Sequence, residues 1–438
     1  MSPVVEGQAR KHRLSPARML DLDPLVDDPA TRIVVCCGSG GVGKTTTAAA
    51  LGLRAAERGR KVVVLTIDPA RRLAQSMGID SLDNTPRRVK GVEGDGELHA
   101  MMLDMKRTFD EIVEAHADPE RASAILANPF YQSLSAGFAG TQEYMAMEKL
   151  GQLRARDEWD LIVVDTPPSR SALDFLDAPK RLGSFLDGKL IRVLLAPAKV
   201  GGRAGMKFLN VGMSMMTGVL GKLLGGQLLK DVQTFVSAMD SMFGGFRTRA
   251  DATYKLLQAP GTAFLVVAAP ERDALREAAY FVERLAAEDM PLAGLVLNRV
   301  HGSGAARLSA ERALAAAENL EESRIVDQED GKAGVRNSPD TDGSSESPAS
   351  DPVSAEGSPA ADRTVEQLTA GLLRLHAERM RLLSREQRTR DRFTALHPEV
   401  AVAEVAALPG DVHDLAGLRD IGTRLAAGRP ELPETADG

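Results

Sequence analysis

The run from Gly38 to Thr45 reads Gly-Ser-Gly-Gly-Val-Gly-Lys-Thr and has the spacing of a phosphate-binding loop. It directly follows the apolar run 33–37 and precedes a segment of helical character, 45–59. The motif needs this order of strand, loop and helix, because its glycines let successive backbone N–H groups point at one anion. The sequence therefore predicts an α/β fold whose first strand ends at a phosphate site.

Two side chains of the loop add charge and metal chemistry to this backbone cradle. Lys44 places a positive charge where the β- and γ-phosphates of a nucleotide bind, and the Thr45 hydroxyl suits Mg²⁺. The helix that begins near Thr45 adds its positive N-terminal end. The predicted phosphate-loop residues are Gly38, Ser39, Gly40, Gly41, Val42, Gly43, Lys44 and Thr45.

Further short apolar runs alternate with helical segments along the chain. Nearly continuous apolar character is typical of parallel strands that are buried on both faces. The fold class predicted is a doubly wound, mostly parallel sheet of the phosphate-loop type with an inserted helical subdomain. The expected strands after the first are 61–67, 98–103, 161–164, 263–268, 292–297 and 402–406.

The strand expected at 161–164 ends on a carboxylate, Asp165. Enzymes with a phosphate loop hold Mg²⁺ beside the nucleotide with a carboxylate in this position, so Asp165 is the second predicted metal residue. Thr166-Pro167-Pro168-Ser169-Arg170 follows, in which Arg170 lies within reach of a phosphate. A plain connecting loop is the alternative interpretation of that segment.

Composition divides the chain into a nucleotide-binding domain, 31–181 and 259–427, and flanking or inserted segments. Residues 182–258 are rich in Met, Leu and Gly, which suits either short core helices or an adaptable surface for a hydrophobic client. Helices expected at 303–320 and around 365–382 flank an acidic Ser/Pro segment, 325–362, that is predicted to be disordered. This segment is either regulatory or an idle loop. The N-terminal tail 1–30 and the C-terminal tail 428–438 complete the division.

Charge and cysteine content exclude several classes of protein. The chain is 43% apolar and 26% charged and has a net charge of −7. It lacks a basic stripe of the kind that predicts nucleic-acid binding. The start lacks the apolar centre of a secretory signal, so we expect a cytoplasmic protein. Glycines and Lys222 interrupt the most apolar region, which argues against an integral membrane segment but allows transient membrane association. Cys36 and Cys37, the two cysteines, are expected to be buried and reduced.

Five motifs together resemble the arsenite-pump and tail-anchored-protein-targeting ATPases, a branch of dimeric ATPases with a deviant Walker A loop. The likeness covers residues 30–427, and the run Gly140-Thr141-Gln142-Glu143 is similar to the actinobacterial anion-transporting-ATPase-like members. The motifs are the loop from Gly38, Asp68-Pro69-Ala70, Asp165-Thr166-Pro167-Pro168, Asn298-Arg299-Val300 and Leu408-Pro409.

This resemblance implies an ATP/ADP site with Mg²⁺ and a role for each matching residue. The amides of Gly41 and Gly43 and the Lys44 amine would hold phosphates, and Thr46 would touch the α-phosphate. Asp165 would reach Mg²⁺ through water, beside its ligand Thr45. Asp68 would orient the attacking water, which makes Asp68 and Lys44 the catalytic pair. Asn298 would bind the adenine edge or merely cap a turn, and Pro409 would pack on the ring.

The sequence departs from the family at Ser39, where members usually carry a lysine that reaches the partner subunit's phosphates. A charge supplied from a partner can be worth roughly 10³ to 10⁵ in rate, so we expect weak ATP hydrolysis by this chain alone. The hypothesis is a heterodimer with a lysine-bearing paralogue, unless Arg71, Arg72 or Arg170 replaces the lysine. Adjacent cysteines argue against metalloid transport, and no C-x-x-C pair is present to clamp zinc between subunits.

Two functions follow from these patterns. The first is an ATP-hydrolysing dimeric switch that couples nucleotide state to binding of a hydrophobic client or membrane-protein segment. The second is a nucleotide-binding regulatory subunit, with little hydrolysis of its own, that stabilises a catalytic paralogue. A partition-type or septum-type ATPase is disfavoured, because the chain lacks a basic surface and a terminal amphipathic anchor.

Overall fold

The computed structural model describes residues 18–68, 72–129, 131–132, 135, 141–167, 248–330 and 359–428. These residues form two compact units, which are described separately below. The first comprises the chain up to Val300 together with Arg390–Pro430, and the second contains His301–Thr389. The predicted Met-rich subdomain, 182–258, lies outside the described residues except for its last turns from residue 248 onwards.

The first unit is built on a sheet that has eight strands in the described part of the chain. The spatial order is β3-β4-β2-β5-β1-β6-β7-β8, and every pair is parallel except β3–β4. This confirms the predicted doubly wound α/β fold. The strands are β1 Ile33–Gly38, β2 Lys61–Thr66, β3 Arg87–Arg88, β4 Glu97–Met102, β5 Leu161–Asp165, β6 Thr262–Ala268, β7 Leu292–Val300 and β8 Val402–Ala406.

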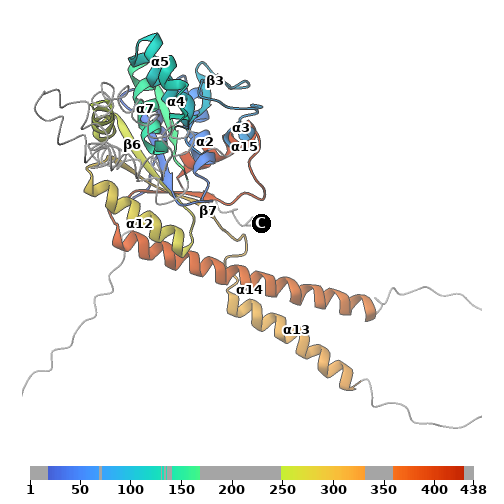
Figure 1. Ribbon diagram of the computed structural model, residues 1–438. Helices are drawn as coiled ribbons and strands as arrows, with labels where there is room; N and C mark the ends of the chain where they lie inside the picture. The colour runs from blue at the N-terminus through green and yellow to red at the C-terminus, as the bar shows by residue number, and fades with distance from the viewer. Residues whose placement is uncertain are drawn as a thin grey trace, which may run out of the picture. The chain divides into compact units, whose positions relative to one another are not determined.

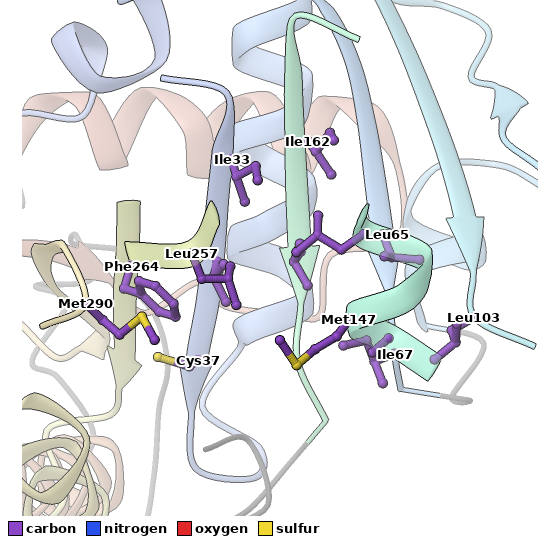
Figure 2. Close-up of a cluster of buried hydrophobic side chains, with 14 of the residues drawn as sticks. Ile33, Cys37, Leu65, Ile67, Leu103, Met147, Ile162, Leu257, Phe264 and Met290 are labelled. Carbon is purple, nitrogen blue, oxygen red and sulfur yellow. The ribbon is translucent and has the colours of Figure 1, made fainter. Parts of the chain in front are cut away.

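Helices cover both faces of this sheet and enclose two separate hydrophobic cores (Figure 1). Side chains of α2 and α15 pack in one core, and those of α4, α7 and α12 pack in the other. Figure 2 shows side chains of this second core, among them Ile33, Leu65, Ile162 and Phe264 from four strands and Met147 of α7. The helices of this unit are α1 Asp23–Asp27, α2 Lys44–Glu57, α3 Arg72–Ser76, α4 Met105–His116, α5 Pro119–Leu126, α7 Thr141–Arg156, α12 Arg272–Ala287 and α15 Leu415–Ala427.

The adjacent cysteines of β1 point to opposite faces of the sheet, as alternation along a strand requires. Cys36 packs in the core beside α2, and Cys37 packs in the core beside α12. Both thiols are free and buried, and burial raises the pKa of Cys37 to about 12. The prediction of a buried, reduced pair is confirmed.

The described part of the predicted N-terminal tail, from residue 18 onwards, includes the short helix α1. Leu22 and Val26 are buried against α2, and Asp23 of α1 accepts two hydrogen bonds from Arg54 at 2.6 and 2.7 Å. These contacts explain why a short, charged segment packs on the sheet domain, although its sequence lacks a long apolar pattern.

The second unit contains two long helices that lie side by side, α13 Ala310–Asp330 and α14 Pro359–Leu396, whose last turns belong to the first unit (Figure 1). Ala313 and Ala317 of α13 are buried, and so are Ala370 and Ala377 of α14. The predicted helical pair is therefore present. Helix also occupies both margins of the segment 325–362, and residues 331–358 lie outside the described part.

Candidate nucleotide site

The phosphate loop connects β1 to α2 and uses glycine where other residues do not fit. A Cβ on Gly38 would lie 2.1 Å from the Val267 carbonyl oxygen of β6, which is far inside contact distance. Gly41 and Gly43 have φ angles of 76° and 93°, in the left-handed region that side chains disfavour. The glycines are therefore required by close strand packing at one end of the loop and by backbone curvature at the other.

Replacing Gly38 by alanine is expected to lower the free energy of unfolding by about 3 kcal/mol, because overpacking adds to backbone strain. Gly41→Ala is the matched control, since its φ is also positive but a Cβ there meets nothing within 4 Å. Its expected cost is about 1 kcal/mol. Denaturant unfolding of both variants measures the difference, and equal costs would contradict the packing explanation.

The start of α2 is suited to binding an anion. Gly43 is the N-cap in a left-handed conformation, and no side chain caps the first turn, which includes Thr46. The first backbone N–H groups of the helix can therefore bind a phosphate. Lys44 is only 5% exposed and donates to the Ser39 carbonyl oxygen at 2.8 Å. Burial lowers the pKa of the Lys44 amine, and a bound phosphate would stabilise its charge.

Asp165 lies at the end of β5 and brings the loop and β2 together. Its Oδ2 accepts hydrogen bonds from the hydroxyls of Thr45 and Thr66, each at 2.8 Å. Its Oδ1 is buried and has no hydrogen-bond partner among the described residues. Burial raises the pKa of this carboxyl to about 6, against the two hydroxyls and Lys44, which lower it. An orphaned carboxylate oxygen beside a threonine hydroxyl fits the oxygen ligands that Mg²⁺ prefers.

Asp68 lies in the turn after β2, next to this cluster. Its backbone N–H donates to Thr66 Oγ1 at 3.2 Å, and its carboxylate charge acts on both Lys44 and Asp165. Gln142 of α7 donates from Nε2 to the Ile67 carbonyl oxygen at 2.9 Å and so braces the same turn. The structure thus brings the predicted residues Lys44, Asp68 and Asp165 to one edge of the sheet.

Two residues of this site were not identified from the sequence. Thr66 ends an apolar strand on a polar side chain, and parallel pairing puts it in register with Asp165. Such a residue at the carboxyl end of a buried strand was a usable signal. Gln142 was quoted only as part of a motif, because its contact with Ile67 spans two distant segments.

The predicted adenine residues lie in different surroundings. Asn298, near the end of β7, donates from Nδ2 to the Val42 carbonyl oxygen of the phosphate loop at 2.9 Å. A Cβ on Gly43 would lie 2.2 Å from that nitrogen. Pro409 is exposed in the turn after β8. Adenine binding by Asn298 and Pro409 stays a prediction. In the structure, Asn298 instead supports the phosphate loop through its hydrogen bond to Val42.

The three arginines considered as substitutes for a lysine at position 39 are not placed. Arg71 and Arg170 lie outside the described residues, as does the side chain of Arg72, whose backbone begins α3.

Thr166, after Asp165, donates from its hydroxyl to the Cys36 carbonyl oxygen at 2.9 Å and links β5 to the end of β1. Within the described ranges, no helix combines the length and apolar character needed to cross a membrane.

Comparison with known proteins agrees with this geometry. A family model described as "Anion-transporting ATPase" matches residues 31–322, more than half of the chain. The ATPase GET3 of Malassezia globosa is 31% identical over 165 residues, which cover 38% of this chain and 47% of that relative. The ATPase GET3 of Podospora anserina and that of Ajellomyces dermatitidis are each 25% identical, over 64% of this chain and 76% of theirs.

Proposed function

Because this chain belongs to the anion-transporting ATPase family, we propose that it binds Mg²⁺-ATP at the β1–α2 loop and hydrolyses it as part of a dimeric switch. Members of the family are ATPases, so ATP hydrolysis is the enzyme class. The observation that carries the proposal is the buried Asp165 carboxylate, which meets the hydroxyls of Thr45 and Thr66 beside Lys44. We expect the protein to act in the cytoplasm.

The binding step follows from the charges of the loop. The uncapped N–H groups of α2 and the amides of Gly41 and Gly43 would hold the phosphates, and Lys44 would turn from the Ser39 carbonyl to a phosphate oxygen. Thr45 and Asp165 would hold Mg²⁺, with Asp165 acting through water. When bound, this ion neutralises charge that develops on the β- and γ-phosphates.

The hydrolytic step needs an acceptor for the proton of the attacking water. Asp68 is half-buried, lies beside Lys44 and Asp165, and is held by Thr66 and by the Gln142-braced turn. We assign it the role of orienting that water and accepting its proton. Because the turn of Asp68 is linked to α7, loss of the γ-phosphate would alter a hydrogen-bonded path away from the site.

The partner and the client are the finer parts of this proposal. Ser39 supplies no charge to a second active site, so a paralogue with lysine at this position would complete the site of this chain. The Met-rich segment 182–258 would form the surface for a hydrophobic client or membrane-protein helix. Its composition supports this assignment, and nearly all of the segment lies outside the described residues.

Asp68→Asn tests the catalytic assignment in the complex reconstituted with the paralogue. Turnover of ATP is expected to fall by about 10²- to 10⁴-fold, because general-base assistance is lost, while nucleotide affinity stays within a few-fold of wild type. Steady-state phosphate release and calorimetric titration with Mg²⁺-nucleotide are the two measurements. Unchanged turnover with intact binding would reject Asp68 as the base.

Ser39 favours a second candidate function, a regulatory subunit that binds nucleotide and stabilises a catalytic paralogue. The same variant separates the two. A regulatory subunit would lose little turnover on Asp68→Asn, because the hydrolysis would occur in the paralogue's site.

A further inference from the structure

Helix α14 carries a row of exposed apolar side chains, which we call the α14 stripe: Val365, Leu368, Leu372, Leu375 and Leu382. Their exposed fractions are 41–64%. Single exposed leucines are normal on a protein surface, but five on one helix at regular spacing are not. The sequence pattern correctly predicts a helix here, yet the apolar face that defines the pattern is not the face that packs on α13.

The spacing of the stripe is that of a coiled coil. The steps from residue 365 are three, four, three and then seven, which places all five side chains at the core positions of heptads. Arg379 occupies the remaining core position. Its guanidinium donates twice to the Gly302 carbonyl oxygen, at 2.9 and 2.7 Å, so its charge is held against its own helical pair.

A different face of α14 contacts α13. Ala370 and Ala377 are buried on that side, His376 Nε2 lies 2.8 Å from the Leu308 carbonyl oxygen, and Arg374 pairs with Glu321 at 2.6 Å. Helix α14 therefore has one buried face and one exposed apolar face. The contacts of the buried face support the helical conformation before the stripe binds a partner. A preformed helix binds a partner helix with less loss of conformational entropy than an isolated one.

We propose that the α14 stripe binds the α14 stripe of a second copy of this chain, with the two helices antiparallel. In this register Leu372 faces the partner's Leu375 next to a two-fold axis, and Val365 faces the partner's Leu382. An isologous contact of this kind closes on itself and needs no second surface. The contact does not depend on nucleotide, so it stands independently of the proposed function.

Charge along the helix selects both the occupant and the orientation. The first half of α14, residues 359–373, has two acidic residues and one basic residue, whereas 374–388 has five arginines and two glutamates. Antiparallel copies bring the acidic end of one to the basic end of the other. A parallel pair would bring the arginine-rich halves of the two helices together, so like charges would meet. The surface is thus complementary to itself in one orientation.

Sedimentation velocity of the full-length chain without nucleotide tests self-association. The wild type and Lys44→Ala are expected to form the same dimer, and Leu372→Glu/Leu375→Glu is expected to weaken it by at least roughly 100-fold, because carboxylates would be buried at the axis. Leu396→Glu is the matched control, since Leu396 is 66% exposed on the same helix but lies outside the stripe. Circular dichroism checks that the exposed substitutions leave the fold intact.

Cysteine cross-linking tests the orientation. The two native cysteines are buried, and a Cβ at Gly371 meets nothing within 4 Å, so Gly371→Cys and Glu378→Cys provide clean exposed thiols. Antiparallel pairing predicts a disulfide when the two variants are mixed, and none from either variant alone. A monomer at all concentrations, or a stripe that binds only the paralogue or anionic vesicles, would overturn the proposal. Cross-links from Gly371→Cys alone would overturn the antiparallel register.

Discussion

The Asp165→Asn variant is expected to bind Mg²⁺-nucleotide about 10- to 100-fold more weakly than wild type, the usual effect of removing a group that supports a metal through water. Nucleotide affinity in the presence of a chelator should change little, because the loop amides and Lys44 are untouched. Calorimetric titrations with and without Mg²⁺ measure the two affinities. The variant keeps an oxygen that can accept from Thr45 and Thr66, so the local hydrogen bonds are preserved.

The same substitution should change how the stability of the nucleotide-free protein depends on pH. Burial raises the pKa of Asp165 from an ordinary 3.8 to about 6, so its charge destabilises the folded state above pH 6. As pH falls through this pKa the folded protein takes up the proton, and the penalty disappears below the unfolded pKa. The stability of Asp165→Asn relative to wild type should therefore fall by about 2 kcal/mol from about pH 7.5 to about pH 4.5.

Asp160→Asn is the matched control for both experiments. Asp160 immediately precedes the same strand at the opposite edge of the sheet, is exposed, and accepts the Lys61 N–H at 2.8 Å. The Asp160→Asn substitution should leave the Mg²⁺ dependence of nucleotide binding unchanged. A stability difference for Asp165→Asn that does not vary with pH would mean that the carboxyl is not held in a buried, charge-penalised state.

The phosphate loop and the parallel strands around it could be predicted because their sequence signals are local. Gly38 and Lys44 belong to one contiguous motif, and buried parallel strands can be recognised in the sequence as continuous apolar runs. Asp165 was found for the same reason, since a carboxylate at the end of such a strand can only lie at the edge where the loop is. Strand β3 was missed because two exposed arginines carry no strand pattern.

Other parts of the site depend on contacts that no local pattern encodes. The hydrogen bond from Asn298 to Val42 joins residues 256 positions apart, and a motif match cannot distinguish it from adenine binding. The need for glycine at position 38 arises from the backbone of β6, not from the loop itself. In α14, apolar periodicity predicts the helix but not which face is buried, because the buried positions hold small alanines and the leucines of the pattern are exposed.

Ser39→Lys is expected to raise ATP turnover by the chain alone by as much as roughly 10³-fold, the lower range for a charge supplied in trans to a phosphoryl transition state. Ser39 is half-buried at the start of the loop, and only its backbone carbonyl contacts Lys44, so a longer side chain leaves that contact in place. The gain requires two copies to meet at their nucleotide sites. Turnover should therefore rise more steeply than linearly with protein concentration, which phosphate release measures directly.

Ser39→Met separates charge from length in this experiment, because methionine is similar in reach to lysine but neutral. It should leave turnover at the level of wild type. If instead the wild-type chain alone hydrolyses ATP as fast as Ser39→Lys, the missing lysine is not limiting, and a basic residue such as Arg71, Arg72 or Arg170 already supplies the charge. In that case the heterodimer loses its chemical rationale, while the ATP site built on Lys44, Asp68 and Asp165 stands, because none of its contacts involves the Ser39 side chain.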